Sequence, residues 1–141
     1  MKKTLLLALT IIITISGLYA TTKAKKAKQT SPIVEVLYFH GKQRCATCIA
    51  VGDYAKEVVD QEFTNQKKAG LVKFKEIDIS TPEGEKIADR YKVTWSALYV
   101  NQWKNGKEQR TDLTSFAFEN AREDTPAYKK RIRELITSLL K

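Results

Sequence analysis

The chain is poor in side chains that bind metal ions. It contains two cysteines, Cys45 and Cys48, and a single histidine, His40. A structural zinc ion takes four ligands, and these three residues cannot complete such a set. We therefore expect no metal centre within one chain, and we expect no cofactor.

The folded part also lacks a strong excess of one charge. Six of the 25 lysines and arginines lie in residues 1–28, and all 16 acids follow, so from residue 29 the balance is 19 basic against 16 acidic residues. No basic stripe interleaved with aromatic residues is present, which argues against a nucleic-acid partner. No internal repeat follows residue 31, and the remaining length suits one domain.

The only long apolar run lies near the N-terminus. Residues 1–20 combine two early lysines, an apolar stretch from Leu5 to Leu18 and the small residue Ala20, a pattern typical of a secretory signal peptide. No cysteine follows the stretch, which excludes a lipoprotein anchor. An uncleaved membrane anchor is the alternative, because the segment from Thr4 to Ala20 is at the short edge of the ~17–25 residues that can span a bilayer, and lysines, which tend to stay on the cytoplasmic side, follow it directly. We expect residues 21–31 to form a lysine-rich linker and the protein to be periplasmic or secreted, or else membrane-anchored.

Residues 32–141 alternate between strand and helix patterns. The near-continuous apolar run 33–39 is typical of a strand buried on both faces. Asn105-Gly106 predicts a tight hairpin, and the apolar parity of residues 71–79 shifts midway, which predicts a bulge, an edge strand or two buried faces. Apolar spacing predicts strands at 33–39, 71–79 and 96–103, helices at 45–66, 82–91 and 125–139, and a charged loop before the last helix. The hairpin signal predicts a fourth strand at 107–112.

This order, β-α-β-α-β-β-α, predicts an α/β fold. A parallel start closed by an antiparallel hairpin gives a three-layer sandwich in which helices cover both faces of a four-stranded mixed sheet.

The motif Cys45-Ala46-Thr47-Cys48 lies where the first strand gives way to the first helix. Unpaired N–H groups and the positive end of the helix dipole stabilise a thiolate there, and such sites lower a cysteine pKa from about 8.5 to roughly 3.5–7.5. Arg44 adds a cation directly before Cys45. We expect Cys45 to be the attacking thiolate and Cys48 the thiol that resolves a mixed disulfide.

Other interpretations of these residues stay open. The cysteines could form a static disulfide, although a loop this short constrains the unfolded chain little. His40 could stabilise the thiolate or relay a proton, or could bond to backbone at a strand end. Arg44 could act on the thiolate or be solvated, and Thr47 could donate to a sulfur or pack.

Strand, loop, CxxC at a helix start and a later hairpin together resemble the thioredoxin-like superfamily over roughly residues 32–140. The segment Tyr38-Phe39-His40-Gly41 through Arg44-Cys45-Ala46-Thr47-Cys48 resembles the bacterial nitrophenyl compound nitroreductase subunit family, ArsF. The resemblance implies that Trp95 and Ser96 lie near the dithiol and dock a substrate; core packing is the alternative for Trp95.

The chain departs from ordinary thioredoxins in three places. The usual WCGPC is replaced by Arg44-Cys45-Ala46-Thr47-Cys48, so a thioredoxin potential cannot be transferred. No proline precedes the third strand, and a cis bond without one costs about 2.5–4 kcal/mol, so we predict a trans bond at Trp95–Ser96. The strand before the motif carries Tyr38 and Phe39 where thioredoxins have a buried acid.

These observations predict an exported thiol–disulfide oxidoreductase whose dithiol exchanges disulfides with a protein partner. The alternatives are a non-catalytic subunit that docks a partner enzyme through the Trp95 region, and a dithiol that binds trivalent arsenic. The N-terminal segment makes membrane association a further expectation.

Overall fold

The structure, a computed structural model, describes residues 31–141; the expected signal peptide and nearly all of the expected linker lie outside them. In this part of the chain no helix is long and apolar enough to cross a membrane. The strands are β1 (Ile33–His40), β2 (Val72–Asp78), β3 (Ala97–Lys104) and β4 (Lys107–Asp112). The helices are α1 (Ala46–Glu62), α2 (Thr64–Lys68), α3 (Pro82–Tyr91), α4 (Thr114–Asn120) and α5 (Thr125–Leu139).

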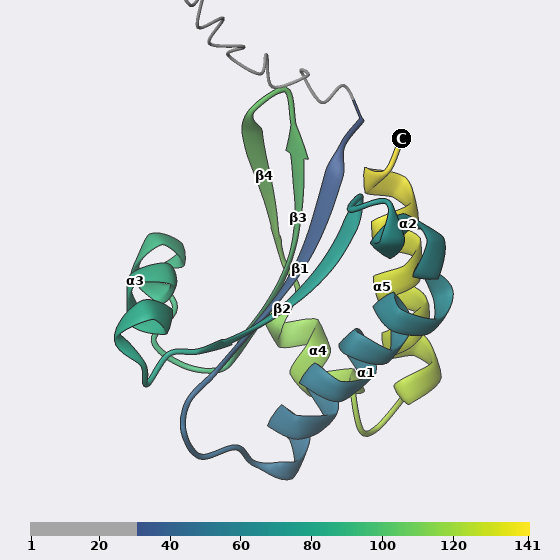
Figure 1. The fold of residues 1–141 in the computed structure, drawn as a ribbon. Helices are drawn as coiled ribbons and strands as arrows, with labels where there is room; N and C mark the ends of the chain where they lie inside the picture. The colour runs from purple at the N-terminus through teal and green to yellow at the C-terminus, as the bar shows by residue number, and fades with distance from the viewer. Residues whose placement is uncertain (1–30) are drawn as a thin grey trace, which may run out of the picture.

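The four strands form one mixed sheet in the order β2-β1-β3-β4. β1 runs parallel to β2 and antiparallel to β3, and β3 and β4 form the hairpin. Helix α3 lies on one face of the sheet, and α1, α2, α4 and α5 lie on the other (Figure 1). The predicted α/β three-layer sandwich with a four-stranded mixed sheet is therefore confirmed.

The central strand β1 contributes to both apolar cores. Tyr38 is fully buried in the core between the sheet and helices α1, α4 and α5, whereas its neighbour Phe39 is fully buried in the smaller core under α3. Successive side chains of a strand point to opposite faces. This explains why the run 33–39 is apolar without alternation.

The predicted hairpin turn at Asn105-Gly106 is confirmed, and a side chain caps the start of α3. Asn105 and Gly106 both have positive φ, as a tight hairpin of this type requires. Thr81 caps α3, because its hydroxyl accepts from the N–H of Gly84 at 3.1 Å. The residue before it, Ser80, bonds to Asp78.

Two helix predictions are wrong in detail. The first helix ends at Glu62 rather than near residue 66, and a separate short helix, α2, begins at Thr64. The segment before the last helix, predicted as a loop, contains α4. Leu113, Ala117 and Ala121, spaced four apart, are buried in the main core and hold α4 in place without a side-chain cap.

Candidate active site

The two cysteines lie at the first turn of α1, the helix that begins directly after the β1–α1 loop. Cys45 is the N-cap residue in an extended conformation, and its Sγ accepts from the N–H of Cys48 at 3.1 Å. The two sulfurs are joined in a disulfide. Cys45 is exposed, while Cys48 is only 5% exposed. The helix-terminal position expected for a stabilised thiolate is therefore present, with one sulfur accessible and the other covered.

Tyr38 lies beneath the disulfide, on the face of the sheet that α1 covers. Its hydroxyl donates to the carbonyl oxygen of Cys48 at 2.6 Å. Burial raises the pKa of Tyr38, against the opposing effect of Arg44, so the phenol stays neutral. As expected from the sequence, no acid lies next to the cysteines on β1, the strand before the motif. The Tyr38 hydroxyl, a neutral hydrogen-bond donor, lies there instead. Sequence reasoning assigned Tyr38 to the core alone, because a tyrosine in an apolar run gives no separate signal.

Close contact between Tyr38 and α1 depends on Gly52, one turn beyond Cys48. A Cβ at Gly52 would lie 2.5 Å from Cε1 of the Tyr38 ring. The absence of a side chain there lets the ring reach the first turn of α1.

An ion pair lies beside the motif. Arg44 donates from Nη1 to Oε1 of Glu76 on β2 at 2.5 Å, and Nε2 of His40 lies 3.3 Å from the same oxygen. The other ring nitrogen of His40 is 2.9 Å from the carbonyl of Gly41. Burial acts to lower the pKa of Arg44, but Glu76 and the Tyr38 phenol outweigh it and raise that pKa. Arg44 therefore stays charged, and its charge is shared with a carboxylate.

No signal in the sequence pointed to Glu76, because this residue lies on β2, 32 residues after Arg44, which is in the loop before α1. An action on the thiolate is one of the two interpretations that the sequence leaves open for both His40 and Arg44. Both side chains contact Glu76, and among residues 31–141 no hydrogen bond joins either of them to a sulfur. Thr47 is partly buried, and within the same range its hydroxyl has no hydrogen bond.

A groove of 740 Å³ opens beside the disulfide. Trp95 lines it and is 76% exposed, whereas Ser96, in the same groove, is buried. All peptide bonds of residues 31–141 are trans, which confirms the expectation for Trp95–Ser96. The groove wall is formed by the loop before α1, the first turn of α1, the loop before β3 and α4. Its residues include Arg44, Cys45, Cys48, Trp95, Ser96 and Phe118.

Phe118 was not predicted, because its segment was expected to be a loop. The structure therefore brings the dithiol, Arg44, Trp95 and Ser96 to one surface, and it adds an aromatic wall from α4. Within residues 31–141 no group of three histidine, cysteine, aspartate or glutamate side chains is placed to hold a metal ion.

Comparisons with known proteins gave similarity to solved structures alone. No protein-family model and no curated protein matches the chain. A thioredoxin from Thermus thermophilus shares 21% identity over 73% of each chain, with a TM-score of 0.49. A structure described as a malarial protein shares 23% identity over 70% of this chain and 96% of its own, with a TM-score of 0.38.

Proposed function

We propose that this chain is an exported thiol–disulfide oxidoreductase that exchanges disulfides with a protein partner through Cys45 and Cys48. The observation that carries the proposal is the asymmetry of the disulfide at the start of α1. Cys45 caps the helix and is exposed beside the groove, while Cys48 is covered. A partner sulfur can reach Cys45, whereas the covered Cys48 can react only with Sγ of Cys45 in the mixed disulfide.

The exchange balances without an added cofactor. A partner thiolate attacks Sγ of Cys45, the Cys45–Cys48 bond breaks, and Cys48 leaves as a thiolate that takes up a proton. A second partner thiolate then attacks the partner's own sulfur in the mixed disulfide and releases Cys45. The partner dithiol loses two electrons and forms a disulfide, and the CxxC motif gains them. The same steps in reverse reduce a partner disulfide.

The groove supports a protein partner. Trp95 exposes a large apolar side chain beside the reacting sulfur, and such a side chain is typical of a docking contact. Export is part of the proposal on the strength of the N-terminal sequence pattern. The resemblance of residues 38–48 to the nitroreductase subunit family also stays a prediction, and the family name adds no chemistry.

Catalysed reduction of insulin by dithiothreitol tests the proposal. We expect the wild-type chain to shorten the lag before turbidity appears, and Cys45→Ser to abolish this effect because the attacked sulfur is gone. Cys48→Ser, the matched control, keeps Cys45 but lacks the resolving thiol. Reduced, freed of dithiothreitol and then mixed with insulin, it should accumulate a mixed disulfide through Cys45, which non-reducing electrophoresis detects.

Equal insulin traces for wild type and Cys45→Ser would contradict an oxidoreductase. Retained binding of both proteins to a co-purified partner would then support the docking subunit. Binding of trivalent arsenic that disappears in Cys48→Ser, measured by calorimetry, would support the third candidate.

A further inference from the structure

Glu76 interrupts an otherwise apolar row on β2. The parallel register pairs Val34 with Val72, Val36 with Phe74, and Tyr38 with Glu76. These pairs share the face that α1 covers, because side chains two residues apart on a strand lie on one face. Val72 and Phe74 pack in the core, and the next position in the row carries a carboxylate. The parity shift in the sequence is explained by an edge strand with apolar residues on both faces and not by a bulge, because β2 lies at the edge of the sheet with Val72 in the main core and Ile77 in the smaller core under α3. Glu76 stands where the row on the α1 side ends.

The carboxylate stands where the row reaches the start of α1. Tyr38, its partner in the ladder, bonds to Cys48, and Arg44, its ion-pair partner, immediately precedes Cys45 and lines the same groove. The side chain of Arg44 is 32% exposed and that of Glu76 is 44% exposed. Glu76 is thus linked to both cysteines through one neighbour each.

The ion pair with Glu76 changes how strongly Arg44 stabilises a thiolate at Cys45. An isolated guanidinium next to the nucleophile would stabilise its thiolate by direct Coulomb attraction. A guanidinium in contact with a carboxylate forms a nearly neutral pair, whose effect on a third charge is much weaker. The start of α1 still stabilises the thiolate through its amides.

We propose that Glu76 is a positioning residue that holds Arg44 and limits how strongly the Arg44 charge stabilises the Cys45 thiolate. The inference rests on the proposed function, in which Cys45 and Cys48 form the reactive dithiol. It identifies the Glu76–Arg44 pair as a determinant of the reactivity of Cys45. Glu76 itself does not touch the reacting sulfurs; it acts through Arg44.

Other charges face this cluster and are the same in every comparison below. Tyr38 and His40 lie on β1, Asp78 lies on β2, and Asp53 and Lys56 lie on α1. Because Oε1 of Glu76 also lies 3.3 Å from His40, the contribution of His40 has to be separated from that of Arg44.

The test follows alkylation of Cys45 by iodoacetamide against pH in the full chain carrying Cys48→Ser, so that one thiol reports. Glu76→Gln should move the profile to lower pH and speed alkylation on its acidic side about threefold, because Arg44 is released. Arg44→Gln should move the profile the opposite way by a similar factor, because the carboxylate is left alone. Combining both changes should return the profile to that of the parent, since the pair has no net charge.

Three further variants make the result specific. Glu76→Asp keeps the carboxylate and should keep the parent profile. Glu62→Gln, the matched control, also removes a carboxylate bonded to an arginine, but it lies at the far end of α1 from the dithiol and should change nothing. His40→Gln should leave the effect of Glu76→Gln intact.

The inference is overturned if Glu76→Gln leaves the profile unchanged, if Glu76→Gln and Arg44→Gln shift it in the same direction, or if the effect of Glu76→Gln vanishes with His40→Gln. Alkylation needs no partner protein. An inactive wild type in the insulin assay would therefore reject the proposed function, while these pH profiles would still decide the role of Glu76.

Discussion

At the scale of single residues, the site depends on groups whose role is set by their neighbours. Tyr38 and Tyr128 are both fully buried, and burial raises the pKa of each, so both stay neutral hydrogen-bond donors. Each donates to a carbonyl of α1: Tyr38 to Cys48 at 2.6 Å and Tyr128 to Val51 at 2.7 Å. Two phenols, one from β1 and one from α5, thus hold the turn that runs from Cys48 to Val51.

Removing the phenol oxygen of Tyr38 should weaken this attachment. We expect Tyr38→Phe to lower the free energy of unfolding by about 1 kcal/mol, because the ring stays packed and one buried hydrogen bond is lost. Urea denaturation of the oxidised protein measures the change, and Tyr128→Phe is the matched variant, with a similar expected loss. A Tyr38→Phe protein as stable as wild type would show that the bond makes no net contribution.

At the scale of helices and strands, the packing of α1 on β1 depends on one small residue. We expect Gly52→Ala to lower the free energy of unfolding by about 1–3 kcal/mol, because the added Cβ overlaps the buried Tyr38 ring and forces α1 outward. The matched control is Gly41→Ala, where a Cβ would meet no atom within 4 Å. Urea denaturation should leave that control near wild type; equal losses in both variants would refute the steric explanation.

Element order was predictable from the sequence because the first three strands and the long helices carry apolar patterns of their own, and Asn105-Gly106 marks the hairpin that leads to β4. The short helix α4 was not, since a stretch of seven residues with charged flanks carries a weak local signal and forms through tertiary contacts. Its buried Leu113, Ala117 and Ala121 are spaced as a helix face, which is visible once the core is known.

The candidate site was predictable to the same extent. The CxxC motif and its position at a helix start are local in sequence, and the approach of Trp95 follows from the fold resemblance. The partnership of Arg44 with Glu76 depends on the register between β1 and β2. A shift by one residue would turn Glu76 to the other face, and nothing in either strand alone fixes that register.

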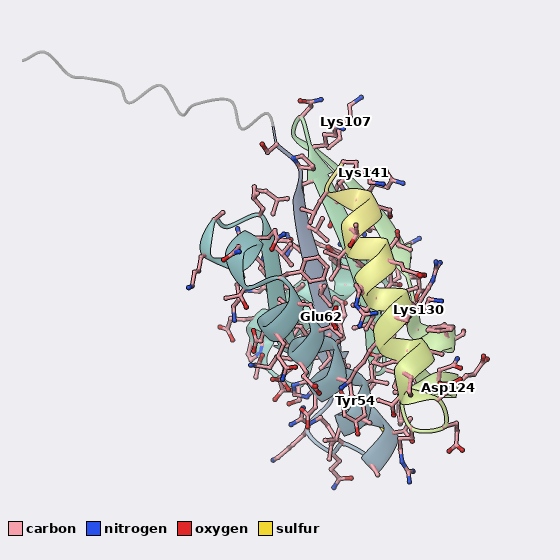
Figure 2. All side chains as sticks on the ribbon, turned by 90° about the vertical axis from the view of Figure 1, so that its right-hand side faces the viewer. Tyr54, Glu62, Lys107, Asp124, Lys130 and Lys141 are labelled. Atoms are coloured by element: carbon pink, nitrogen blue, oxygen red, sulfur yellow. A yellow bond between two sulfur atoms is a disulfide. The ribbon has the colours of Figure 1, made fainter. Side chains whose placement is uncertain are left out.

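At the scale of the whole molecule, ion pairs join α1 to α5, the helices that enclose the main core. Figure 2 shows the two helices side by side, with Glu62 on α1. Arg133 of α5 donates two hydrogen bonds to Glu62, and Lys129 pairs with Glu57 at 2.8 Å. Asp60 of α1 accepts from Lys56 on the same helix and from Lys67 on α2. Each of these ion pairs therefore depends on an ionised carboxylate of α1.

This arrangement predicts a loss of stability in acid. Hydrogen bonds from Lys56 and Lys67 lower the pKa of Asp60, and those from Arg133 lower the pKa of Glu62. A carboxylate with a depressed folded-state pKa contributes stability that is complete above its unfolded pKa, about 4, and is lost as pH falls through the folded value. We expect the urea midpoint of the oxidised protein to fall between about pH 5 and pH 2.

Glu62→Gln should be less stable than wild type at neutral pH and should lose less stability on acidification. Glu119→Gln is the matched control, because Glu119 is exposed on α4 and forms no ion pair within residues 31–141; its stability should follow the wild-type curve. If Glu62→Gln instead parallels wild type at every pH, the Glu62–Arg133 pair does not link stability to protons, and the acid sensitivity must come from the remaining carboxylates.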